Sequence, residues 1–143
     1  MSINVNSSYL AVIRDSVGSR MFRHLFIDNA DGTSTDIIKN GRLGCAYYVS
    51  FILYHFKLII EPHAVVASTV NDMKANGWSV VKGPEVGDVL VWEASKEHVE
   101  DELHEHIGFY VGEGRAISNS STLGEIVEHD WVFRNVTMIL RRP

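Results

Sequence analysis

The chain has 143 residues, of which 45% are hydrophobic and 22% charged, so its length and composition indicate one soluble globular domain over residues 1–143. The formal charge is −5 and the 13 basic residues are scattered, which argues against a nucleic-acid partner, because phosphate binding needs clustered Lys and Arg. One cysteine excludes an intramolecular disulfide, and the apolar stretch 46–60 is too short and too interrupted to span a membrane.

Helices are predicted in the first half of the chain. Apolar residues recur at three- or four-residue spacing in three segments, which run from near residue 8 to 21, from 45 to 57 and from 64 to 76. Asn6 or Ser7 can cap the first helix, and Gly77 ends the third in the position that a helix C-terminus prefers. Residues 28–33 are rich in turn formers and are predicted to be a loop.

Strands are predicted in the second half. Short β-branched and aromatic runs, separated by glycine or polar clusters, occupy residues 80–81, 88–92, 107–111, 116–118, 126–128 and 136–140. Helices therefore come first and strands follow. This order favours an α+β fold with N-terminal helices packed on a small antiparallel sheet.

Cys45 is the candidate nucleophile, because it stands where a glycine-containing loop runs into the second predicted helix. At a helix N-terminus the backbone dipole favours a thiolate, and the N–H groups there can stabilise an oxyanion. A lone cysteine followed by a distant histidine is the minimal pattern of a cysteine hydrolase. His106, at the start of a predicted strand, is therefore the candidate general base.

The strand that carries His106 has two different faces. His106 and Gly108 share one face, whereas Ile107 and Phe109 share the other. Because Gly108 has no side chain, we expect the helix end that carries Cys45 to approach the histidine on the Gly108 face. The opposite, apolar face is expected to bury against the core.

Three segments resemble motifs of NlpC/P60-type papain-like peptidases, over about residues 41–121. Residues 84–92 (Pro-Glu-Val-Gly-Asp-Val-Leu-Val-Trp) resemble the Pro-x-x-Gly-Asp strand of that family. Residues 106–114 resemble its strand of the form His-hydrophobic-Gly-hydrophobic-Tyr-hydrophobic-Gly-x-Gly. Residues 44–49 resemble the nucleophile helix, and their tyrosine pair is closer to the related CHAP amidases.

The resemblance implies roles for individual residues. Cys45 would be the nucleophile and His106 the general base, with a third polar residue orienting the imidazole. In the family this third residue is usually a histidine on the next strand; here the matching position is Ser118, with Asn119 beside it. We favour Asn119, because asparagine orients the histidine in other papain-like enzymes, and keep Ser118 as the alternative. Gly44 replaces the aspartate that usually precedes the cysteine.

The resemblance also implies an activity. It is cleavage of an amide bond in peptidoglycan, either as a stem-peptide endopeptidase or as a muramoyl-alanine amidase, by a monomer without a cofactor. The partner would be a peptidoglycan fragment or a peptide, and the acidic loop 97–105 would favour a basic or amine-bearing substrate. The N-terminus lacks the basic-then-apolar pattern of a secretory signal, so the localisation stays open between export by a non-classical route, association with a phage and a leader that is missing from this sequence.

Two other interpretations stay open. The missing aspartate and the altered third residue are compatible with a catalytically silent binding module on the same fold. A metal site is the other interpretation, because His104 and His106 share a strand face and His98, Asp101 and Glu102 lie nearby. No further ligand stands at a regular offset elsewhere, so we expect no metal.

Overall fold

The computed structural model describes residues 1–96 and 103–143. These residues form the helices α1 (Val5–Asp15), α2 (Cys45–His55) and α3 (Val66–Ala75), and strands follow them in the second half of the chain. The predicted α+β class is therefore confirmed. Within residues 1–96 and 103–143, no helix has the length and apolarity needed to cross a bilayer.

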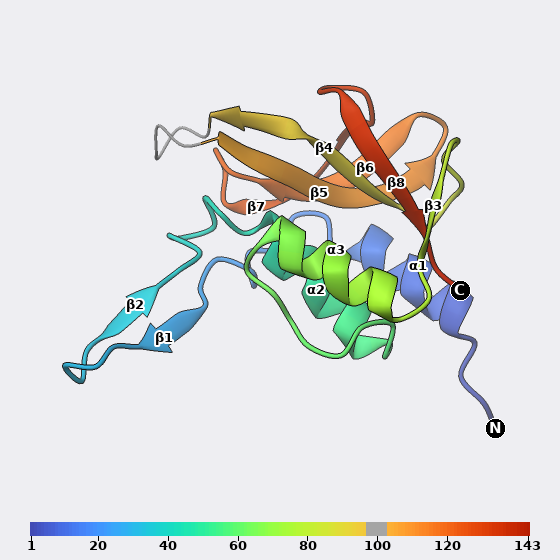
Figure 1. Ribbon diagram of the computed structural model, residues 1–143. Coiled ribbons are helices and arrows are strands. Elements are labelled where there is room, and N and C mark those ends of the chain that lie inside the picture. The colour runs from blue at the N-terminus through green and yellow to red at the C-terminus, as the bar shows by residue number, and fades with distance from the viewer. Residues whose placement is uncertain (97–102) are drawn as a thin grey trace.

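One sheet of six antiparallel strands forms the second half of the described chain. Its strands, in spatial order, are β3 (Ser79–Val81), β8 (Val136–Arg141), β4 (Val89–Lys96), β5 (Leu103–Gly112), β6 (Arg115–Ser120) and β7 (Glu125–Asp130). Figure 1 shows α1, α2 and α3 on one face of this sheet. The register pairs Trp92 with His106 across β4 and β5, and Phe109 with Ile117 across β5 and β6.

A small hairpin stands away from this body (Figure 1). It consists of β1 (Phe26–Asp28) and β2 (Ser34–Asp36), and the predicted loop supplies mainly its turn. Neither strand was predicted from the sequence, because each has three residues and no buried face that would impose an alternating pattern.

The main core lies between the helices and the sheet. Phe109 of β5 is fully buried there, and the rings of Tyr9 from α1 and Tyr48 from α2 meet it edge-on at centroid distances of 5.8 and 5.5 Å. Ile107 joins the same cluster. The apolar face of β5 therefore packs against the helices, as its alternation predicts.

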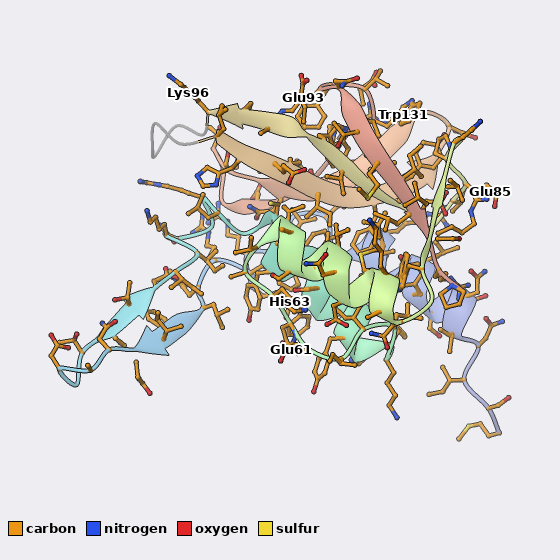
Figure 2. The ribbon with its side chains drawn as sticks, in the orientation of Figure 1. Glu61, His63, Glu85, Glu93, Lys96 and Trp131 are labelled. Atoms are coloured by element: carbon orange, nitrogen blue, oxygen red, sulfur yellow. The ribbon has the colours of Figure 1, made fainter. Side chains whose placement is uncertain are left out.

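The opposite face of the sheet has a smaller apolar cluster of its own. Leu90 and Trp92 of β4 and Ala116 of β6 are buried in it, and Trp131 packs against them. Figure 2 shows Trp131 on the side of the sheet away from the helices. This outer face matters for function, because it also receives the side chain of His106.

The first helix differs from its prediction. It begins at Val5, and its cap is Asn4, whose side-chain oxygen accepts a hydrogen bond from the backbone N–H of Ser7 at 3.0 Å. The predicted caps Asn6 and Ser7 are wrong, because both lie inside the helix. The helix also ends at Asp15, before the apolar pattern in the sequence stops.

Candidate active site

Cys45 is the first residue of α2 and is partly exposed. Gly44 occupies the N-cap position of α2 and makes no side-chain hydrogen bond to the first turn. The first N–H groups of any helix have no acceptor inside the helix, so those of α2 point toward the thiol end of the site. The Sγ atom lies 4.0 Å from the carbonyl oxygen of Glu105 on β5. The thiol therefore lies between a helix N-terminus and the beginning of β5.

A cavity of about 380 Å³ opens at this thiol. Cys45, Glu105, His106 and Asn119 all contribute to its wall. The loop before α2, the segment 64–67 and the beginning of β5 complete the lining. The predicted nucleophile and the predicted base thus border one cavity that is large enough for part of a peptide.

Asn119 holds the loop that leads into α2. Its side-chain Nδ2 donates a hydrogen bond to the carbonyl oxygen of Gly41 at 2.7 Å, and the residue is 3% exposed. A Cβ atom added at Gly44 would lie 3.2 Å from this same Nδ2 and 3.0 Å from the carbonyl oxygen of Phe22. Asn119 therefore occupies the space that a side chain at position 44 would need, and its contacts fix the approach to Cys45.

His106 is held by Ser118 and, through it, by His129. The Nε2 atom of His106 lies 2.9 Å from Ser118 Oγ, and the same oxygen lies 2.6 Å from His129 Nε2. His129 Nδ1 in turn lies 2.8 Å from the carbonyl oxygen of Asp130. Of the two residues proposed to orient the imidazole, the structure places Ser118, and not Asn119, against it.

Aromatic rings enclose the two imidazoles on the outer face of the sheet. The Trp92 ring lies 5.3 Å from the His106 ring and 5.6 Å from the His129 ring, as centroid distances. Phe133 meets the same two rings at 5.8 and 4.6 Å. These contacts restrict rotation of both imidazoles.

The face of β5 that carries Gly108 is filled, which corrects one expectation. A Cβ atom at Gly108 would lie 2.7 Å from Ser118 Cβ and 3.1 Å from Cη2 of Trp92. The glycine therefore makes room for Ser118 and Trp92. The helix α2 packs against the opposite face, through Phe109, so the expected approach of the helix on the Gly108 face is wrong.

His106 borders two cavities, one on each side of the sheet. Their pairing covers Phe109 to Gly112 on β5 and Arg115 to Ile117 on β6. Toward the beginning of β5, His106 and Ser118 meet through their side chains instead. His106 borders the cavity on the helix side and also a second cavity of about 240 Å³ on the outer face.

Burial dominates the electrostatics of the two imidazoles. Desolvation, with smaller contributions from the positive charge of Arg134 and from His129, lowers the pKa of His106 from 6.5 to about 3. Desolvation also lowers the pKa of His129. Both rings are therefore neutral at pH 7, and His106 is available there as a proton acceptor.

The Gly-Asp pair of the segment 84–92 has a structural role. The carboxylate of Asp88 is 3% exposed and accepts hydrogen bonds from Arg141, at 3.0 Å from Nε and 2.8 Å from Nη2. It also accepts the backbone N–H of Glu85 at 2.8 Å. This motif therefore closes the turn before β4 and ties it to β8.

The histidine and carboxylate group considered for a metal falls mostly outside the described residues. His98, Asp101 and Glu102 lie there, as does most of the acidic segment. Residues 103–105 begin β5, so that part of the expected loop is a strand. Among residues 1–96 and 103–143, no three His, Cys, Asp or Glu side chains are grouped so that they could hold a metal ion.

His129 was not predicted from the sequence as a site residue, and the structure places it against Ser118. Its participation depends on the register of β6 with β7, where Ala116 pairs with His129 and Ser118 with Val127. No local motif gives this register. No protein-family model and no curated protein matches this chain.

Proposed function

We propose that this protein is a papain-like cysteine hydrolase that cleaves an amide bond, with peptidoglycan as its substrate class. The observation that carries the proposal is the shared cavity. Cys45 borders it from the first turn of α2, and His106 borders it from β5 while Ser118 holds the Nε2 atom of the imidazole. A nucleophile, a base and an orienting group are the parts that such a reaction needs.

The chemistry follows from these positions. The Cys45 thiol gives its proton to His106 while sulfur forms a bond to the amide carbon, and the carbonyl oxygen becomes an oxyanion near the first-turn N–H groups of α2. His106 then protonates the leaving nitrogen as the C–N bond breaks, which leaves a thioester. Water, deprotonated by His106, adds to the thioester carbon and releases the acid, and the sulfur regains its proton.

The neutral state of His106 shapes this mechanism. Burial and Arg134 both oppose an imidazolium ion, so the resting imidazole is neutral. A neutral imidazole can accept the thiol proton as the sulfur attacks. The substrate class rests on the resemblance of residues 44–49, 84–92 and 106–114 to NlpC/P60 motifs.

The test compares wild type with Cys45→Ala on purified peptidoglycan. Wild type should release soluble fragments, and mass spectrometry of those fragments would identify the broken bond. Cys45→Ala should release none, while its melting temperature should stay close to that of the wild type. Equal release by both proteins would refute the proposal.

A second candidate is a catalytically silent binding module on the same fold. The observation that favours it is the environment of His106. Burial and Arg134 oppose protonation of this imidazole, and the proposed reaction requires a transient imidazolium ion. A module of this kind would bind peptidoglycan equally well with Cys45→Ala. Its thiol would also react with iodoacetamide at the rate of an ordinary exposed cysteine.

A further inference from the structure

We propose that His129 is a positioning residue that sets, through Ser118, which nitrogen of His106 carries the proton. This inference rests on the proposed function, because it concerns the base of that reaction. It adds to the site a residue that lies on a different strand, β7, and that no motif indicates. The three side chains form a continuous chain of hydrogen bonds across β5, β6 and β7.

The direction of each hydrogen bond follows from a fixed acceptor at the end of the chain. The carbonyl oxygen of Asp130 can only accept, so His129 Nδ1, at 2.8 Å, must carry a hydrogen. In a neutral imidazole the other nitrogen is then an acceptor. Ser118 Oγ–H therefore donates to His129 Nε2, over 2.6 Å.

The hydroxyl of Ser118 has one hydrogen, which it donates in its hydrogen bond to His129 Nε2. Ser118 Oγ can then only accept from His106, so His106 Nε2 carries a hydrogen and donates it over 2.9 Å. The remaining nitrogen, Nδ1, is left without a proton. Since Nε2 is committed to Ser118, Nδ1 is the atom of His106 that can accept the proton of Cys45.

Ser118 alone would not impose this tautomer. A hydroxyl donates as readily as it accepts, so a serine without His129 could give its hydrogen to His106 Nε2. His106 would then carry its proton on Nδ1 and would be blocked as a base. His129 removes this ambiguity, which explains how serine can stand where the family usually has histidine.

Protonation of His129 reverses the direction of both hydrogen bonds, from His129 to Ser118 and from Ser118 to His106. Its Nε2 would then donate to Ser118, whose hydroxyl would donate to His106 Nε2, and the base would be blocked. The titratable and charged groups around His129 are His106 on β5, Arg115 on β6, Glu128 and Asp130 on its own strand, and Arg134 after β7. Burial lowers the pKa of His129, so the productive direction holds at neutral pH and is lost in acid.

The test reads the tautomer directly, without a substrate. Nitrogen-15 NMR of histidine-labelled protein at pH 7 distinguishes protonated from bare ring nitrogens. We expect His106 to carry its proton on Nε2 in wild type and to shift toward Nδ1 in His129→Phe. His129→Gln offers an amide oxygen as the acceptor and should retain the wild-type tautomer. His55→Phe, an exposed change at the last residue of α2, is the matched control and should change nothing.

Hydrolysis provides the second readout. His129→Phe should lower turnover by about tenfold or more, within the roughly 10⁴-fold loss caused by a wrongly held tautomer. A proton on Nδ1 of His106 in wild type, or an unchanged tautomer in His129→Phe, would overturn the inference. If His129→Phe does not fold, the wild-type and His129→Gln spectra decide. If the spectra show the expected tautomers but Cys45→Ala still hydrolyses peptidoglycan, the proposed function fails and the inferred hydrogen-bond chain stands.

Discussion

Replacing His106 with glutamine removes a titrating group from the buried part of the site, so it should change how stability depends on pH. His106 is 8% exposed, and burial, assisted by the charge of Arg134, lowers its pKa to about 3. In the unfolded chain the same group takes up a proton near pH 6.5. Between these values the unfolded state binds a proton that the folded state lacks, so stability decreases as the pH falls.

The size of this effect follows from the two pKa values. Each pH unit over which the two states differ by one proton changes the free energy of unfolding by about 1.4 kcal/mol. From pH 6.5 to pH 4.5, and allowing for half-protonation of the unfolded side chain at the start, His106 should cost the wild type about 2 kcal/mol. His106→Gln lacks this contribution, whereas every other ionisable side chain is the same in both proteins.

Urea denaturation at pH 6.5 and pH 4.5 measures the difference. The wild type should lose about 2 kcal/mol more than His106→Gln over this interval, whatever the absolute stability of the variant. His55→Gln is the matched control, because it makes the same substitution at an exposed position and keeps His106, so it should show the larger loss. Equal losses in the wild type and His106→Gln would show that His106 titrates normally, and the burial argument would be wrong.

Three further substitutions test the packing around the site. Gly108→Ala should cost about 1–3 kcal/mol in urea denaturation, because its Cβ would lie 2.7 Å from a backbone oxygen of β6; Gly83→Ala, with nothing within 4 Å, should cost little. Asp72→Ala should cost about 1–3 kcal/mol by the same assay, because this buried carboxylate accepts hydrogen bonds from the backbone N–H groups of Ile60 and Glu61 and contacts the His63 imidazole. A cost below about 1 kcal/mol would contradict this role. Asn119→Ala should cost about 1–3 kcal/mol through the unpaired Gly41 carbonyl and should leave the His106 tautomer unchanged in the NMR spectrum; a changed tautomer would make Asn119 the orienting residue.

The sequence predicted the parts of the fold that depend on local patterns. The change from helical to strand periodicity near Gly77 gave the α+β class. The second helix begins at Cys45, as its sequence indicated, because Gly44 ends the loop there. The start of α1 was missed, because Asn4, Asn6 and Ser7 are all good caps and the choice depends on how Tyr9 and Ile13 reach the core.

The arrangement of the site depends on strand register, which local sequence patterns do not reveal. Alternation along β5 predicted which residues share a face with His106, but not which element would cover that face. Ser118 and Asn119 are neighbours in sequence and lie on opposite faces of β6, so the register of β6 against β5 decides which one meets the imidazole. His129 depends on the register of two strands, which no single segment encodes.

Cys45 is the only thiol in the protein, and it lies partly exposed on a cavity wall. Any electrophile that reacts selectively with thiols will therefore modify this one position, and intact-protein mass spectrometry will report it as a single added mass. Libraries of weakly reactive fragments can be screened in this way before the substrate is known. A fluorescent or spin label attached at the same sulfur would report when the cavity is occupied, without any change to the natural sequence.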